Sequence, residues 1–261
     1  MHITLNNRTA LITGGSKGLG LAMAKMFAEA GGHVALVARG EAALEAAAAE
    51  IRAAAPAATV VPIAADIRSA AGCADAFARA EAGLGQVDIL INNAGTSQRG
   101  PFLTITEELW EDDLALKLRA AIRLCRAVLP GMRERKWGRI INVLNIGAKA
   151  PAATSTPTSV SRAAGMALTK ALANEYAPDN VLVNALLVGI IESDQWVRRH
   201  AGEQRNISWE EWKAEQGKSV PMGRMGRPEE FAAQALLLAS EMGGYTTGVA
   251  INIDGGRSPV V

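Results

Sequence analysis

The chain has 261 residues, and its 27 basic and 26 acidic residues leave a net charge of +1. This balance offers no broad positive field for nucleic acid or anionic membranes, and 49% hydrophobic with 20% charged residues is ordinary globular composition. The two cysteines lack metal-binding spacing, no apolar run reaches about 18 residues, and the first residues lack a signal-peptide pattern. We therefore expect a cytoplasmic protein that binds no metal, nucleic acid or membrane.

Short β-branched runs alternate with Ala-rich helical stretches along the chain. Strands are predicted at residues 9–13, 34–38, 59–64, 87–91, 139–144, 181–187 and 248–253. Helices are predicted at residues 19–30, 41–55, 69–82, 106–135, 157–176 and 228–241. Strict alternation predicts a parallel sheet covered by helices on both faces. Because no repeat or linker interrupts it, we expect one domain over 1–261, with a polar, Trp-containing insertion at about 189–227.

The turn after the first strand is rich in glycine and opens the first predicted helix. Glycines allow a sharp turn and close approach of a pyrophosphate, and the helix start offers unpaired N–H groups. The expected dinucleotide-binding residues here are Gly14, Ser16, Lys17, Gly18, Leu19 and Gly20. The alternative is a glycine-rich turn without a ligand.

The end of the second strand bears on which dinucleotide binds. A cofactor without a 2′-phosphate usually meets an acid there, whereas this chain has Ala38 and Arg39. Arg39 can pair a 2′-phosphate, and Lys17 adds a second positive charge nearby. The residues thus favour NADP(H) over NAD(H), although both cations could instead be solvated surface residues.

Three motifs together resemble one enzyme family. TGGSKGLG at 13–20, NNAG at 92–95 and DGG at 254–256 are similar to motifs of the short-chain dehydrogenase/reductase family, collinear over about residues 5–257. The tail at 231–256 resembles the β-ketoacyl-carrier-protein-reductase-like branch. The resemblance implies a doubly wound Rossmann fold with a seven-stranded sheet, a nicotinamide cofactor and a homotetramer.

The resemblance also implies further cofactor contacts, at the adenine ring, at the adenosine ribose and sheet centre, and at the nicotinamide carboxamide. Asp66 and Ile67 would lie beside the adenine ring. Asn93, Ala94 and Gly95 would lie under the adenosine ribose and the sheet centre. The loop with Gly189, Ile191 and Ser193 would hold the nicotinamide carboxamide. The last loop departs from the family at two positions, with Val188 where proline is usual and Ser193 where threonine is usual.

The family's Asn–Ser–Tyr–Lys tetrad is substituted at all four positions. Alignment with the family places Lys117 at the asparagine, Asn145 at the serine, Thr158 at the tyrosine and Arg162 at the lysine. Neither tyrosine of the chain is followed by a lysine four residues later. The chain therefore resembles an atypical branch with a substituted motif.

Each substitution changes what the position can do. Thr158 is a far weaker acid than tyrosine, Asn145 can still donate to an oxyanion, and Arg162 can clamp a ribose but not lose a proton. Lys117 lies beside an apolar stripe, and burial would depress its pKa and make it an acid or base. Each of three positions also has a purely structural alternative. Thr158 could simply be a residue of the first helical turn, Asn145 could be hydrogen-bonded to backbone, and the Lys117 ammonium could reach water.

The residues therefore support two hypotheses. One is an NADP(H)-dependent oxidoreductase that acts on a small carbonyl or alcohol with Lys117, Asn145, Thr158 and Arg162 as a non-standard catalytic set. The other is a catalytically silent NADP(H)-binding protein, a sensor or subunit. In the insertion, His200 is a weak candidate for a substrate-side acid, and the tryptophans are expected to pack a lid over the site.

Overall fold

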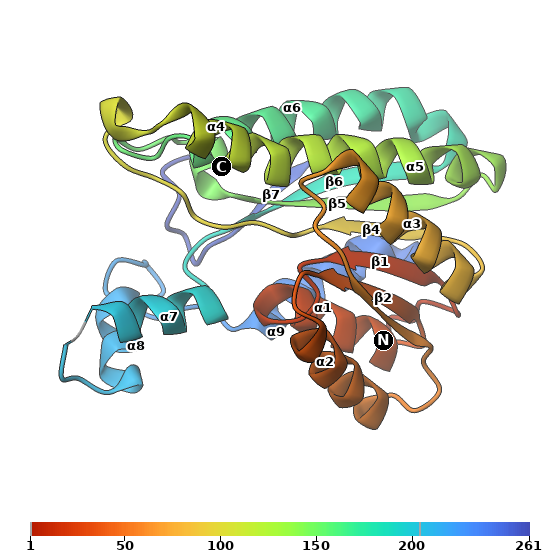
Figure 1. Cartoon of the computed structure of the whole chain (residues 1–261), viewed down its shortest axis with the longest axis horizontal. Coiled ribbons are helices and arrows are strands. Elements are labelled where there is room, and N and C mark those ends of the chain that lie inside the picture. Colours follow the sequence, from red (N-terminus) through yellow and green to blue (C-terminus); the bar gives the residue numbers. More distant parts are fainter. Residues whose placement is uncertain (1, 204) are drawn as a thin grey trace.

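The computed structural model describes residues 2–203 and 205–261, and these contain a seven-stranded parallel sheet in the order β3-β2-β1-β4-β5-β6-β7 (Figure 1). The strands are β1 (Thr9–Thr13), β2 (His33–Ala38), β3 (Val60–Ala64), β4 (Ile89–Asn92), β5 (Gly138–Asn145), β6 (Val181–Val188) and β7 (Ala250–Ile253). The predicted doubly wound, seven-stranded sheet is confirmed.

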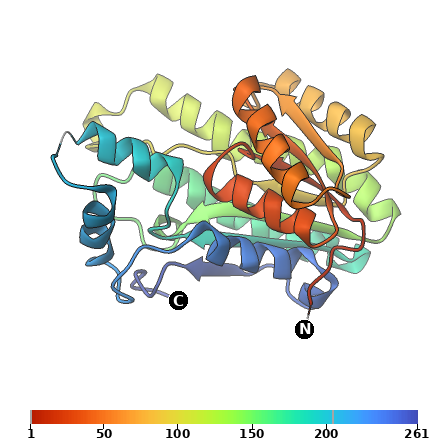
Figure 2. The same ribbon diagram turned by 90° about the horizontal axis from the view of Figure 1, so that it is seen from below.

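Helices cover both faces of this sheet, with α1, α2 and α9 on one side and α3, α5 and α6 on the other (Figures 1 and 2). The helices are α1 (Gly18–Glu29), α2 (Glu41–Ala54), α3 (Ala70–Leu84), α4 (Glu107–Leu114), α5 (Ala120–Glu134), α6 (Thr158–Tyr176), α7 (Asp194–Gly202), α8 (Trp209–Gly217) and α9 (Pro228–Ala239). None of the helices among the described residues is long and apolar enough to cross a membrane.

Burial on both faces explains why the strands read as continuous apolar runs. All five residues of β1 are buried, and so are seven of the eight in each of β5 and β6. A parallel strand sandwiched between two helical layers has no solvent face, so alternation is lost. The hydrophobic runs in the sequence therefore located the central strands well.

The strand order reverses between β1 and β4. From β1 the chain moves outward to β2 and β3, and it then crosses back so that β4 lies on the other side of β1. Ligands of doubly wound folds bind in the crevice beyond the carboxyl ends of the strands at such a reversal. The glycine loop after β1 and the segment after β4 both begin at this point.

Three predicted elements differ from the structure. The long helix predicted at 106–135 is interrupted by a π-helical turn, η2 (Ala115–Arg119). The last helix ends at Ala239 and not at 241, because Ser240 is extended and its side chain accepts a hydrogen bond from the Met242 amide. The insertion contains the helices α7 and α8, whose nine residues each are too few for a clear periodicity.

Helices α7 and α8 project beyond the two helical layers that cover the sheet (Figure 1). They pack on each other through Trp196 of α7, whose ring centroid lies 5.8 Å from that of Trp212 of α8, and Trp212 also stacks on Trp209 of its own helix at 5.5 Å. Trp212 is fully buried, and its indole donates to Glu203 at 2.8 Å. The tryptophans are thus the core of the insertion, as expected for lid packing.

Candidate active site

The glycine loop after β1 adopts a conformation that requires glycine. Gly14 and Gly18 have φ values of +66° and +53°, which strain any residue with a Cβ. A Cβ on Gly20 would lie 2.1 Å from the Gly14 carbonyl oxygen, so the start of α1 packs directly against the loop backbone. No side chain of the described residues caps α1, which leaves its first amides for an anion.

Asn93, which follows β4, and Thr13, which ends β1, hold this loop in place. The side-chain amide nitrogen of Asn93, Nδ2, donates to the carbonyl oxygens of Thr13 at 2.9 Å and Gly14 at 3.3 Å. Thr13 Oγ1 in turn accepts the backbone amides of Asn93 and Ala94 at 2.9 and 3.0 Å. The Asn93 side chain is therefore committed to the loop backbone, so it would act on a cofactor by shaping the cradle.

The two expected 2′-phosphate cations lie in different surroundings. Arg39 is exposed and directly follows β2, which ends at Ala38. Lys17 is also exposed, but its Nζ lies 3.5 Å from Asp194 Oδ1, at the start of α7. A Cβ on Gly18 would lie 3.3 Å from the Ser193 Cβ, so the glycine loop and the start of the insertion are neighbours. Lys17 thus connects these two segments.

The other expected cofactor residues surround the same end of the sheet. Asp66 is exposed after β3 and accepts the Arg68 amide at 3.1 Å, while Ile67 is buried. Gly189 packs so closely that a Cβ would lie 2.5 Å from the Asp254 Cβ. Ile191 forms an isolated bridge with Gly226. Their contacts with a cofactor stay predictions.

Lys117 lies inside the protein at the π-helical turn. Its side chain is 0% exposed, so the alternative of a lysine that reaches water is wrong. Its Nζ donates to Thr158 Oγ1 at 2.8 Å and forms a close ion pair with the Asp113 carboxylate. A π-helical turn inside an α-helix often marks a functional site, and here it carries the position that the family alignment singled out.

Asp113, like its partner Ser161, is a residue of this cluster that the sequence analysis missed. It is buried, and its Oδ2 accepts a hydrogen bond of 2.6 Å from Ser161 Oγ, which is also buried. Its Oδ1 lies 3.3 Å from Thr158 Oγ1. The signal that was available is the four-residue spacing between Asp113 and Lys117, which places opposite charges on one helix face.

Thr158 is the first residue of α6, and its hydroxyl is fully engaged. It donates to the Gln98 carbonyl oxygen at 2.6 Å, and it accepts from the Gln98 amide at 3.1 Å and from Lys117. A threonine hydroxyl has one proton, and the backbone of Gln98 takes it. Thr158 therefore fastens the segment after β4 to α6 and positions Lys117.

Arg162 brings a second cation to the cluster. The residue is partly buried, its Nη1 donates to the Val143 carbonyl at 2.9 Å, and its buried Nε has no partner among the described residues. A Cβ on Gly95 would lie 2.4 Å from Arg162 Nη2 and 3.8 Å from Lys117 Cε, so both side chains border this glycine. Burial lowers the pKa of Arg162 to about 10, against the opposing effect of Asp113.

The cluster holds more positive than negative charge. Burial, and then the nearby Arg162, lower the pKa of Lys117 to about 8, although Asp113 opposes the shift. Two cations thus face one carboxylate where little water screens them. Loss of a proton from Lys117, or arrival of negative charge on a ligand, would relieve this imbalance.

Asn145 ends β5, and its side chain is not satisfied by backbone. Its Oδ1 is buried and forms no hydrogen bond with any residue that the structure describes. A buried amide oxygen without a partner is costly, which favours a role toward a ligand. The alternative of a backbone-satisfied asparagine is therefore wrong.

His200 lies apart from this cluster. Its ring packs on Trp209 and Trp212 at centroid distances of 5.7 Å, and its Nε2 lies 3.0 Å from the Ile207 carbonyl oxygen. These contacts assign it to the packing of the insertion. A cavity of about 150 Å³ lies between the insertion and the ends of β6 and β7, lined in part by Ile191, Met222 and Asp254, and none of the four tetrad positions lines it.

The doubly wound sheet, the glycine loop at the strand reversal and the polar cluster beyond β5 define a dinucleotide-binding α/β protein. The model of the short chain dehydrogenase family matches residues 8–204. The chain belongs to this family.

Relatives match the chain over its whole length. It is 32% identical to the 3-oxoacyl-[acyl-carrier-protein] reductase FabG of Chlamydia pneumoniae, over 98% of this chain and 99% of the relative. L-sorbose reductase of Gluconobacter frateurii, solved with NADPH and L-sorbose, superimposes with a TM-score of 0.95 at 32% identity, over all of both chains. An NADPH-bound short chain oxidoreductase of Pseudomonas aeruginosa PAO1 is described as containing an atypical catalytic center. It superimposes with a TM-score of 0.91 at 36% identity, over 99% of this chain and 100% of the neighbour.

Proposed function

We propose that the chain is an NADP(H)-dependent oxidoreductase that interconverts a small carbonyl compound and its alcohol, with Lys117 as the proton donor in place of the family's tyrosine. The observation that carries the proposal is the buried Lys117, held 2.8 Å from Thr158 Oγ1 with Arg162 beside it at the carboxyl edge of the sheet. Lys117, Asn145, Thr158 and Arg162 are thus the proposed catalytic set.

The residues at the strand reversal fit a dinucleotide. The glycine loop and the free amides of α1 would hold the pyrophosphate, Arg39 with Lys17 the 2′-phosphate, and Arg162 beside Gly95 the nicotinamide ribose. NADPH in two structural neighbours supports this choice of cofactor. When bound, the nicotinamide would supply the hydride that adds to the carbonyl carbon.

The chain's own residues would complete the reduction. As negative charge develops on the carbonyl oxygen, the Lys117 ammonium gives it a proton, and the neutral amine is reprotonated before the next turnover. A pKa of about 8 suits this task, because the group is mostly protonated at pH 7 yet parts readily with its proton. Arg162 stays charged throughout, and Asn145 can donate a hydrogen bond to the same oxygen.

Two relatives suggest two candidate substrate classes. The L-sorbose reductase neighbour points to a hydroxylated ketone, whereas the FabG relative points to a 3-oxoacyl thioester. The insertion at 189–227 would shape the pocket that distinguishes them. We also propose that the chain is a single domain, that it forms a homotetramer as is common in its family, and that it acts in the cytoplasm.

A paired measurement tests the proposal. Oxidation of NADPH is followed with a panel of ketoses, simple ketones and 3-oxoacyl thioesters, and binding of NADPH is measured by calorimetry on the same protein. Turnover of one class is the expected result. Tight binding without turnover of any class would instead support the sensor or subunit hypothesis, and absence of binding would overturn both.

A further inference from the structure

Asp113 is the one carboxylate among the described contacts of Lys117, and neither of its oxygens is free. Oδ1 pairs with Lys117 and lies 3.3 Å from Thr158 Oγ1, while Oδ2 accepts from Ser161 Oγ at 2.6 Å. The side chain belongs to α4, whereas Thr158 and Ser161 belong to α6. Asp113 and Ser161 are each 1% exposed, so this carboxylate joins two helices in the interior.

The charges around Lys117 come from two directions. Asp113 on α4 is the negative group, and Arg162 on α6 is the second positive group. The Gln98 backbone and the hydroxyl groups of Thr158 and Ser161 complete the polar surroundings and carry no charge. Two of the three ammonium protons of Lys117 have partners, Asp113 and Thr158, and the third has none among the residues in the described ranges.

We infer that Asp113, oriented by Ser161, is the positioning residue of the reaction: it holds the Lys117 ammonium in the site and balances its charge against Arg162. The inference rests on the proposed function and deepens it, since it identifies the group that keeps Lys117 protonated. Asp113 itself touches neither substrate nor cofactor. It acts through Lys117.

A purely structural ion pair would behave differently. Buried ion pairs add little net stability compared with apolar side chains of similar size, so stability gives a weak reason for this cluster. A positioning role instead predicts that the neutral isostere Asp113→Asn shifts the pH profile of the reaction, because it changes how the proton donor Lys117 titrates. Without the carboxylate, burial and Arg162 act unopposed, and the pKa of Lys117 falls further.

The test follows the pH profile of kcat/KM for the best substrate of the panel. Reduction needs the protonated amine, so the wild-type rate falls as the pH rises through about 8. In Asp113→Asn this fall should begin at a pH lower by about one unit or more, with a loss of about five-fold or more at pH 8. Ser159→Ala is the matched control, because this buried serine of α6 bonds Ser155 and should leave the profile unchanged.

A second measurement does not depend on turnover. Lysine labelled with ¹³C at Cε is titrated by NMR in the free protein, and the Lys117 signal is identified by its absence in Lys117→Met. The midpoint should fall in Asp113→Asn, and Asp113→Glu should return it to within about half a unit of wild type. Asp113→Glu also serves if Asp113→Asn does not fold.

The outcomes separate the two claims. A wild-type midpoint and profile retained in Asp113→Asn would overturn the inference, as would a midpoint in Asp113→Glu far from that of wild type. A protein without turnover in which Asp113→Asn still lowers the Lys117 midpoint would overturn the proposed function and leave the charge balance by Asp113 intact.

Discussion

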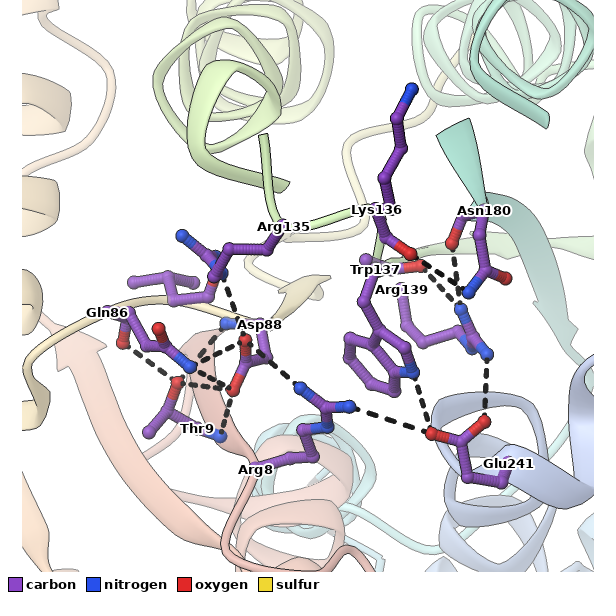
Figure 3. Close-up of polar contacts among 12 residues, drawn as sticks. Arg8, Thr9, Gln86, Asp88, Arg135, Lys136, Trp137, Arg139, Asn180 and Glu241 are labelled. Atoms are coloured by element: carbon purple, nitrogen blue, oxygen red, sulfur yellow. Dashed lines mark hydrogen bonds and ion pairs between the residues drawn. The ribbon is translucent and has the colours of Figure 1, made fainter. Parts of the chain in front are cut away.

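The two ends of the sheet each carry a cluster of charged side chains, and the clusters differ in how their charges are met. At the amino ends of the strands, Asp88 accepts from the Thr9 amide at 3.2 Å and from Gln86 at 3.0 Å, and its Oδ1 lies 3.8 Å from Arg8 and 3.5 Å from Arg135 (Figure 3). The Asp88 side chain is 1% exposed, but both arginines are 30% exposed. The carboxylate is thus well supplied with donors, and water reaches the cations.

The same end also accommodates a buried arginine. Burial lowers the pKa of Arg139, and its guanidinium lies 4.4 Å from the Trp137 ring centroid and 3.8 Å from the exposed Glu241 carboxylate (Figure 3). Trp137 also donates to Glu241 at 2.7 Å. Aromatic stacking and a partner open to water compensate this charge.

At the carboxyl ends the balance is left incomplete. Lys117 and Arg162 share one carboxylate, and Lys117 has no exposed side-chain surface. Stability alone does not account for a buried excess of positive charge, because its repulsion is unfavourable until an anionic group enters. The comparison teaches that the cluster whose cations water reaches supports the fold, even with Arg139 Nε buried without a partner among the described residues, and that the cluster closed to water is the candidate for chemistry.

The largest expected effect is at the amino end. Asp88→Ala removes the carboxylate and leaves the Thr9 amide and two arginines without it, so the free energy of unfolding should fall by about 3–5 kcal/mol. Urea unfolding measures this loss, and turnover per folded molecule should stay at the wild-type level. A loss below about 1 kcal/mol would show that water replaces the carboxylate as partner of the Thr9 amide and the two arginines. The cluster at the amino ends would then not be needed for stability, and its contrast with the cluster at the carboxyl ends would be lost.

Lys117→Met should affect the rate. Loss of the proton donor is expected to cost about 2–4 kcal/mol in kcat/KM, because nothing else in the cluster can neutralise the developing alkoxide by giving up a proton. Steady-state kinetics with NADPH measures it. Lys25→Met is the control, since this partly exposed lysine of α1 pairs with Glu50 of α2. Equal rates for the two variants would refute the role of Lys117.

Arg39→Ala tests the cofactor end. NADPH affinity should fall about ten-fold, or about 1.4 kcal/mol, while NADH affinity should change little, because one charge-assisted pair with the 2′-phosphate is lost. Calorimetric titration of both cofactors measures this. Lys17→Ala should weaken NADPH less, since Asp194 already engages the amine. Equal affinities of the wild type for both cofactors would contradict the assignment.

Thr158→Val should have the smallest effect on rate, below about 1.4 kcal/mol in kcat/KM. Its hydroxyl proton is held by the Gln98 carbonyl, so it is not available to a substrate. The variant should instead lose about 1–2 kcal/mol of unfolding free energy, measured in urea, because the Gln98 backbone groups lose a buried partner. Activity abolished here yet retained in Lys117→Met would reverse the roles given to the two residues.

The sequence by itself was enough for the features that depend on local pattern. A strand covered on both faces must be apolar throughout, and a loop with positive φ must carry glycine, so β1, β5, β6 and the turn at Gly14 were predictable. The family alignment also indicated Lys117, Asn145, Thr158 and Arg162. These properties follow from the backbone conformation and burial of each segment.

The tertiary structure decided how those residues meet. In the sequence, Asp113 is one acid among several at the start of a helix, and its function depends on α6 lying against α4 so that Ser161 reaches it. Three other features also depend on the tertiary structure: the burial of Lys117, the contact of Lys17 with Asp194, and the packing of His200 among tryptophans. They involve segments that are distant in the chain or too short to show a periodic pattern. A local pattern records which face of an element is apolar, but the charge that a side chain meets across an interface depends on where two elements cross.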